Sequence, residues 1–104
     1  MSNFLRACSV EDIPDGAAIA VELEGVPVCL ARSGGEVMAL LDECSHAEVA
    51  LSDGEVSEGT VECWLHGSRF DLRTGKPIGP PATESVPTYP VRVDGNDVLV
   101  AVKE

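Results

Sequence analysis

The chain has 104 residues, of which 44% are hydrophobic, and its 18 acidic and 7 basic side chains give a formal net charge of −11. This size and composition fit one folded domain and exclude a disordered chain. The charge argues against nucleic acid as a partner, because phosphate backbones repel an acidic surface. With no recognisable leader and no apolar run of about 18 residues, we expect a monomeric cytoplasmic protein without a membrane span.

Short β-rich segments separated by turn residues follow one another along the chain. Residues 9–16 predict about one turn of helix, because Pro14 stops a longer one. Predicted strands cover residues 17–23, 26–32, 36–41, 69–72, 89–93 and 98–104. Gly34-Gly35 and Asp94-Gly95 are typical of tight turns between antiparallel strands. The pattern predicts an all-β fold, either an antiparallel sandwich or a small barrel, interrupted between residues 44 and 66.

Residues 75–90 carry most of the chain's seven prolines. Proline has no amide hydrogen to donate and stiffens the backbone, so this stretch predicts an ordered loop and not a central strand. A plain connector and a cover over a functional site are both compatible with it.

Four cysteines in a cytoplasmic chain are more typical of thiols or metal ligands than of disulfides. Cys8 and Cys29 have no histidine nearby and lie in apolar, strand-like surroundings. We predict that both are buried as small apolar residues.

Both histidines of the chain follow a cysteine closely, in Cys44-x-His46 and Cys63-x-x-His66. Random placement would give this arrangement about once in 170 sequences, so a metal site is the better explanation. Thiolate and imidazole bind both zinc and iron. A zinc finger usually pairs its two histidines on a helix, whereas strand and turn residues follow His66. Two loops that each offer one sulfur and one nitrogen suit a binuclear iron centre better.

The spacing C-x-H-x₁₆-C-x-x-H resembles the signature of Rieske proteins. The match continues through Ala50–Gly54, Val61–Cys63, His66–Ser68, Phe70-Asp71, Thr74-Gly75 and Pro81-Ala82. The chain is similar to the small Rieske-type ferredoxins of bacterial aromatic-ring dioxygenase systems, most closely from about residue 42 to residue 82. The resemblance implies a single Rieske domain over 1–104, an antiparallel β-sandwich with a small two-loop cluster-binding subdomain at about 42–82.

The same resemblance implies one [2Fe-2S] cluster and its ligands. Cys44 and Cys63 would bind the inner iron, and His46 and His66 the outer iron. A third loop at 79–82, with Pro80 and Pro81, would shield the cluster from solvent.

Respiratory Rieske proteins differ from this chain around the cluster. They carry a disulfide where this chain has Val49 and Leu65, and a tyrosine that bonds a cluster sulfur where it has Phe70. Ser68 is retained as a hydrogen-bond donor. Fewer donors to sulfur predict a reduction potential toward the low end of the Rieske range of about −150 to +300 mV.

The implied function is that of a one-electron carrier from an NAD(P)H-dependent flavin reductase to a terminal Rieske non-haem iron oxygenase. We expect no enzymatic activity of its own, because the cluster uses both histidines and no nucleotide-binding glycine pattern is present. Trp64 and Leu65, at the tip of the second loop, either form an apolar docking rim or pack inward. Acidic residues such as Glu43, Glu48 and Glu62 either steer basic partners or simply keep the protein soluble.

Two other functions stay open at this stage. One is a small subunit held permanently in a reductase such as nitrite reductase. The other is a structural zinc module used for interaction.

Overall fold

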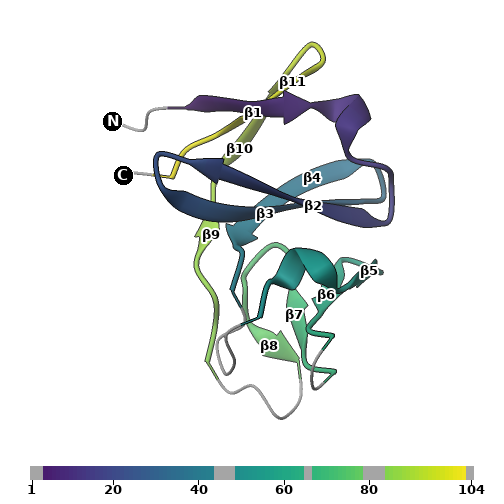
Figure 1. Cartoon of the computed structure of the whole chain (residues 1–104). Coiled ribbons are helices and arrows are strands. Elements are labelled where there is room, and N and C mark those ends of the chain that lie inside the picture. Colours follow the sequence, from purple (N-terminus) through teal and green to yellow (C-terminus); the bar gives the residue numbers. More distant parts are fainter. Residues whose placement is uncertain (1–3, 44–48, 65–66, 79–83, 103–104) are drawn as a thin grey trace.

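The computed structural model describes residues 4–43, 49–64, 67–78 and 84–102 (Figure 1). Its elements in chain order are β1 (Leu5–Ser9), the 3₁₀ turn η1 (Val10–Asp12), β2 (Ala17–Leu23), β3 (Val26–Ser33), β4 (Glu36–Leu41), the 3₁₀ turn η2 (Leu51–Asp53), β5 (Glu55–Ser57), β6 (Thr60–Glu62), β7 (Arg69–Asp71), β8 (Pro77–Ile78), β9 (Thr88–Tyr89), β10 (Val91–Asp94) and β11 (Asp97–Val100). No helix in these ranges is long and apolar enough to cross a membrane.

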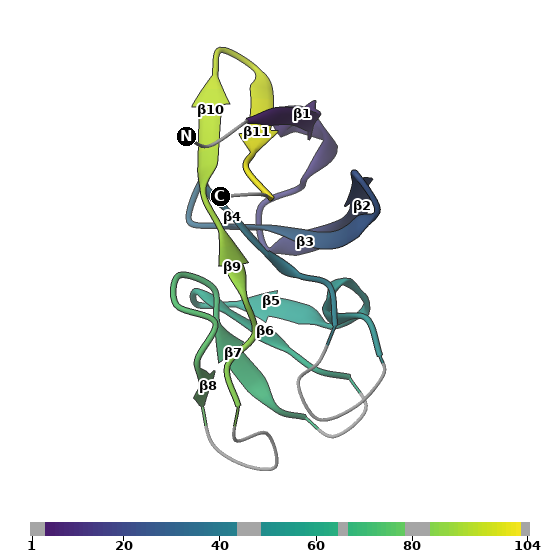
Figure 2. The ribbon, with the colours of Figure 1, turned by 90° about the vertical axis from the view of Figure 1, so that its left-hand side faces the viewer.

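The strands form three antiparallel sheets stacked along the molecule. Sheet A has the order β1-β11-β10, sheet B β2-β3-β4-β9 and sheet C β5-β6-β7-β8. Sheet B is the middle layer in both ribbon views (Figures 1 and 2). The predicted all-β antiparallel fold is confirmed.

The two inner strands of sheet B, β3 and β4, are buried on both faces, and β3 shows this most clearly. Val28 and Leu30 point into a core shared with sheet A, which we call the A–B core. Cys29 and Ala31 point into a second core shared with sheet C, the B–C core. All four side chains have no exposed surface. Because side chains alternate across a strand, an unbroken apolar run is what a strand buried on both faces requires.

The predicted strand 89–93 is two strands in two different sheets. Tyr89 pairs with Ala39 in sheet B, whereas Val91 pairs with Val100 in sheet A. Pro90 stands between them, and its carbonyl accepts a hydrogen bond from the Ala101 amide at 3.1 Å. Proline cannot donate to a ladder, so the chain changes sheets there. Figure 2 shows β9 continuing upward into β10.

Several elements were absent from the sequence prediction. These are β1, β5, β6 and β8, which are at most five residues long. The β5–β6 hairpin turns at Glu58-Gly59, where both residues have positive φ. The short β8 is the outer strand of sheet C, which agrees with the prediction that the proline-rich stretch is no central strand. The remaining predicted strands are confirmed, with end shifts of a few residues. The predicted strand 98–104 corresponds to β11, which ends at Val100, and residues 103–104 lie outside the described residues.

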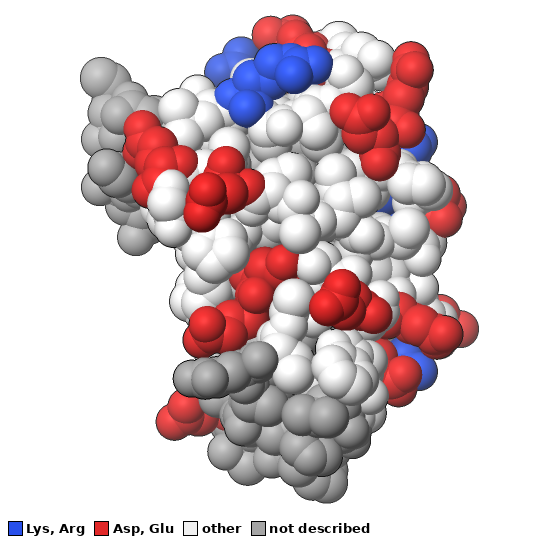
Figure 3. Space-filling model, in the orientation of Figure 1, with Lys and Arg blue, Asp and Glu red and all other residues white. Residues whose placement is uncertain are grey.

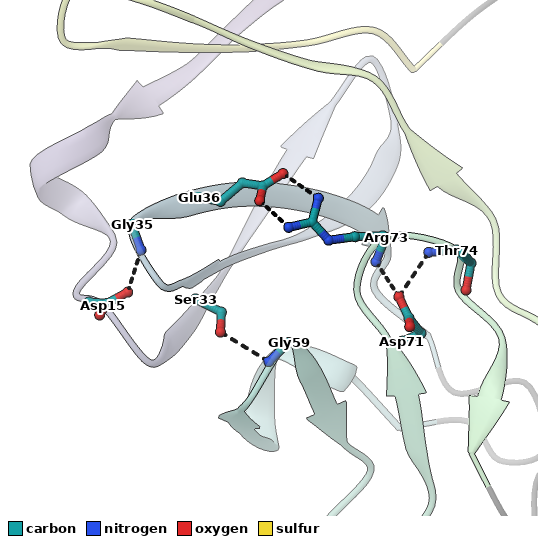
Figure 4. Close-up of polar contacts among 8 residues, drawn as sticks. All are labelled: Asp15, Ser33, Gly35, Glu36, Gly59, Asp71, Arg73 and Thr74. Carbon is teal, nitrogen blue, oxygen red and sulfur yellow. Dashed lines mark hydrogen bonds and ion pairs between the residues drawn. The ribbon is translucent and has the colours of Figure 1, made fainter.

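Polar contacts join sheet C to sheet B on one side of the molecule (Figure 4). The Gly59 amide donates to the Ser33 hydroxyl at 3.1 Å, and the Arg73 guanidinium binds both carboxylate oxygens of Glu36. Asp71 accepts the backbone amides of Arg73 and Thr74 at 2.8 and 3.2 Å, which shapes the turn after β7. The turns of sheet C are thereby held against the β3–β4 hairpin.

The prediction that Cys8 and Cys29 are buried is confirmed, with 6% and 0% of their surface exposed. Burial raises the pKa of both thiols, because the interior disfavours a thiolate. Cys29 belongs to the B–C core and Cys8 to the A–B core. Both are neutral apolar residues of the fold.

Two substitutions of Cys29 test separately whether the B–C core requires the volume of this side chain or its apolar character. We expect Cys29→Ser to lower the free energy of unfolding by about 2 kcal/mol, because it buries a hydroxyl in the B–C core. Cys29→Ala, which leaves a small cavity but no polar atom, should be less destabilising. Urea denaturation of both variants measures the difference. Equal stability of serine and alanine variants would contradict an apolar environment at this position.

Candidate metal centre

Only part of the predicted site lies in the described residues. Cys63 is described, whereas Cys44, His46 and His66 lie outside, as do Leu65, Pro80 and Pro81. Trp64, Ser68 and Phe70 can also be placed. The assignment of four ligands therefore stays a prediction, and the described residues show what surrounds Cys63.

The strand register brings the segments next to the predicted ligands to one end of sheet C. Glu62 pairs with Glu55 on one side and with Arg69 on the other, and Arg69 pairs with Ile78. Cys63 directly follows Glu62, so it leaves the sheet at this end. Ile78, which belongs to the proline-rich stretch, is at the same end of the sheet.

The segment with the first two predicted ligands, Cys44 and His46, is followed by η2 and then by β5, which begins at this end of sheet C. The turn η2 precedes β5, and its Leu51 is fully buried in the B–C core. The pairing in sheet C thus brings together segments that include Leu51, Cys63 and Ile78, which are 12 and 15 residues apart in the sequence.

Cys63 lies at the base of a short closed loop. Its amide donates to the Ser68 carbonyl at 2.6 Å, and its own carbonyl accepts the Gly67 amide at 2.8 Å. The side chain has no exposed surface and belongs to the B–C core together with Val61 and Phe70. A buried thiol beside an apolar core fits the inner, solvent-shielded sulfur ligand of an iron–sulfur centre.

Ser68 and Phe70, which follow Cys63 by five and seven residues in the chain, are both fully buried. Ser68 is a polar residue whose hydroxyl is a candidate donor to a cluster sulfur, and that role stays a prediction. Phe70 packs in the B–C core and brings no hydroxyl to it. The side chains around Cys63 are therefore mainly apolar, and they exclude water from the side of the site that faces the B–C core.

Two glycines of the matched motif are required by close backbone approaches. A Cβ on Gly54 would lie 1.7 Å from the carbonyl oxygen of Glu62, so the chain before β5 abuts the end of β6. A Cβ on Gly75 would lie 2.0 Å from the carbonyl oxygen of Val86, and Gly75 also has a φ of +74°. The Val86 amide donates to the Gly75 carbonyl at 2.9 Å. This contact attaches the later part of the proline-rich stretch to the β7–β8 turn.

Two large apolar side chains are exposed at the site end of sheet C. Trp64 exposes 54% of its surface and Ile78 exposes 49%. Of the two alternatives for Trp64, the structure therefore has the side chain facing solvent. No local sequence pattern predicts this place for Ile78, because it is the β7–β8 register that brings it to the same end of sheet C as Cys63.

The surface around this end is predominantly acidic. Glu43, Glu55 and Glu84 are exposed, while Glu62 is half-buried and pairs with Arg69 at 3.7 Å. Figure 3 shows acidic side chains spread over one face of the molecule, including the half formed by sheet C. An apolar rim with carboxylates nearby suits contact with a partner that carries basic residues.

Comparison with known proteins yields a family match and close relatives. The model of the Rieske [2Fe-2S] domain matches residues 3–90. The biphenyl dioxygenase ferredoxin subunit of Pseudomonas sp. strain KKS102 is 43% identical over 99 residues, covering 94% of this chain and 91% of that protein.

Solved structures give the same fold. The ferredoxin of carbazole 1,9a-dioxygenase from Nocardioides aromaticivorans IC177 has a TM-score of 0.91 at 38% identity, covering 98% of this chain and all of that one. A ferredoxin in a complex with the oxygenase of carbazole 1,9a-dioxygenase has a TM-score of 0.89 at 30% identity, covering 97% and 94%. A putative nitrite reductase small subunit from Mycobacterium tuberculosis has a TM-score of 0.90 at 26% identity, covering 100% and 98%.

The contact between Gly75 and Val86 predicts that Gly75→Ala is more harmful than an ordinary glycine substitution. We expect it to lower the free energy of unfolding by about 2–4 kcal/mol, since a methyl group must displace backbone as well as tolerate positive φ. Gly95→Ala is the matched control, because Gly95 has a φ of +63° but nothing within 4 Å of its Cβ position. It should cost about 1 kcal/mol. Thermal unfolding compares the two, and equal losses would contradict the close approach.

Proposed function

The chain belongs to the Rieske [2Fe-2S] domain family, and we propose that it is the ferredoxin component of a multicomponent oxygenase. In this role it takes single electrons from an NAD(P)H-dependent flavin reductase and delivers them to a terminal Rieske non-haem iron oxygenase. The observation that carries the proposal is the match to a dioxygenase ferredoxin subunit over nearly the full length of both chains. The relative seen in complex with an oxygenase supports the second partner.

We assign one [2Fe-2S] cluster to this chain, held by Cys44 and Cys63 on the inner iron and by His46 and His66 on the outer iron. When bound, such a cluster takes up and returns one electron. The buried Cys63 supports the inner position, because its side chain faces the B–C core. The cluster-binding subdomain then covers about residues 42–82 within a single domain of 1–104.

The residues around the site have separate tasks in this proposal. The B–C core excludes water on the inner side, and the stretch with Pro80 and Pro81 shields another side. Ser68 donates a hydrogen bond to the cluster, while Phe70 supplies none, which favours a low potential within the Rieske range. Catalytic steps belong to the partners, since the chain offers neither a second set of iron ligands nor a nucleotide-binding pattern.

Trp64 and Leu65, together with Ile78 at the same end of sheet C, form the proposed apolar docking rim. Its exposure in a strongly acidic protein supports this role, because exposed apolar groups gain free energy when a partner covers them. The carboxylates nearby steer a basic partner toward the rim. Docking there brings the partner close to the outer iron.

A permanent small subunit of a nitrite reductase is the second candidate, and the fold similarity to such a subunit favours it. The net charge of −11 argues against a large permanent apolar interface. Purification distinguishes the two: the chain alone should behave as a stable monomer if it is a mobile carrier, and should co-purify with a large reductase if it is a subunit.

The first test of the proposed function is a metal analysis with EPR before and after reduction by dithionite. We expect two irons and two sulfides per chain, no signal when oxidised, and a rhombic signal of low average g when reduced. Cys63→Ser should abolish or alter the signal, while Cys8→Ser, at a buried cysteine outside the site, should leave it unchanged. A colourless protein with one zinc would instead establish a structural metal site.

Trp64→Ala tests the docking rim. We expect the second-order rate of reduction by a flavin reductase of a dioxygenase system to fall about tenfold, the equivalent of 1.4 kcal/mol of lost contact. The reduction potential should not change, since Trp64 is exposed. Phe4→Ala is the control, because Phe4 is 37% exposed and lies in the N-terminal segment leading into sheet A. Equal rates for both variants in stopped-flow measurements would remove Trp64 from the docking surface.

A further inference from the structure

Asp42 and Ser52 join the two ends of the segment that carries the first pair of predicted ligands. Asp42 directly follows β4, and Ser52 lies in the turn η2. Residues 43–51 lie between them and include Cys44 and His46. The contact therefore stands at the base of the first ligand loop, the name used here for residues 43–51.

Both carboxylate oxygens of Asp42 accept a hydrogen bond from the same serine. Oδ1 accepts the Ser52 backbone amide at 2.7 Å, and Oδ2 accepts the Ser52 hydroxyl at 2.6 Å. Bonds to an ionised acceptor are roughly twice as strong as bonds between neutral groups. Both groups are partly buried, so water and salt weaken the contact less than they weaken a surface pair.

Each partner in this contact is itself anchored. The Asp42 amide donates to the Pro27 carbonyl at 3.0 Å, which attaches this residue to the start of β3 in sheet B. Ser52 follows Leu51, which has no exposed surface in the B–C core. The pair therefore connects sheet B to the turn in front of β5 across the ends of the first ligand loop.

The two ligand loops are closed by different kinds of bond. The second loop is closed by backbone groups, from the Cys63 amide to the Ser68 carbonyl and from the Gly67 amide to the Cys63 carbonyl. Where the structure describes the ends of the first loop, their backbone hydrogen bonds join residues close in sequence. The Glu43 amide donates to the Leu41 carbonyl at one end, and the Asp53 amide donates to the Ala50 carbonyl at the other. Side-chain groups of Asp42 thus make the connection that backbone groups make in the second loop.

We propose that Asp42 and Ser52 are positioning residues for the metal centre: their paired hydrogen bonds hold the first ligand loop closed and so control how firmly the cluster is retained. This inference rests on the proposed function, because it assigns Cys44 and His46 to the cluster. Opening this pair frees one sulfur and one nitrogen ligand together. The rate of cluster loss then follows the stability of the Asp42–Ser52 contact.

The test measures release of iron from purified holoprotein to an excess of the chelator ferrozine, with excess ascorbate present because ferrozine binds only ferrous iron. We expect Asp42→Ala to release iron about tenfold faster than the wild type, because both charge-assisted bonds are lost. Ser52→Ala keeps the charge and the amide bond, so its rate should rise about threefold. Asp42→Asn, which retains an acceptor for the amide, should lie closer to the wild type. Asp53→Ala is the control: it removes the same charge from an exposed neighbour and should release iron at the wild-type rate.

Two further readouts separate positioning from a general loss of stability. Hydrogen exchange of the Ser52 amide should accelerate in Asp42→Ala while amides of β3 stay protected. The EPR signal of the reduced variant should broaden, because a loosened loop holds two ligands in a range of positions. If Asp42→Ala fails to fold, Ser52→Ala carries the test.

Wild-type release rates in both Asp42→Ala and Ser52→Ala would overturn the inference while leaving the proposed function intact. A rate in Asp53→Ala equal to that in Asp42→Ala would also overturn it, since charge alone would then explain the effect. A wild-type protein without two irons and two sulfides would overturn the proposed function and this inference together.

Discussion

The burial of the inner strands of sheet B on both faces is the constraint on which the rest of the molecule depends. β3 places Val28 and Leu30 in one core and Cys29 and Ala31 in the other, with none of the four exposed. Sheet A alone or sheet C alone presents too few apolar side chains to be stable, because short strands need a second layer to cover them. Sheet B provides this covering layer for both sheet A and sheet C, and the candidate site lies on the side that faces sheet C.

The B–C core and the hydrogen bonds between sheets B and C together position the site relative to the middle sheet. The B–C core includes Leu51, Cys63 and Phe70, and its apolar side chains line the inner side of the site. The contacts of Arg73 with Glu36 and of Gly59 with Ser33 hold sheet C against the β3–β4 hairpin. Because each surface ion pair adds little by itself, apolar burial provides most of the stability and the polar contacts mainly define orientation.

The same layered arrangement leaves a suitable surface for an electron carrier. The B–C core lies on the inner side of the site, and Trp64 and Ile78 are exposed at the end of sheet C. The acidic surface favours rapid encounter with basic partners without tight binding, which a carrier that visits two proteins in turn requires. In these proposals, retention of the cluster and release of the partner depend on different parts of the structure.

The sequence by itself determined the chemistry and much of the local structure. The types and spacing of Cys44, His46, Cys63 and His66 predict an iron–sulfur site without coordinates, and paired turn residues such as Gly34-Gly35 predict hairpins, because both are properties of neighbouring residues. The burial of Cys29 also follows from an apolar strand pattern.

Only the tertiary structure decided which distant residues meet. The register of sheet C brings Cys63 and Ile78 to one end, Pro90 divides one apolar run between two sheets, and Asp42 reaches Ser52 across the first ligand loop. The side on which Trp64 lies is likewise a result of packing. None of these follows from a local pattern, since strand register and contacts across a loop depend on how whole layers pack.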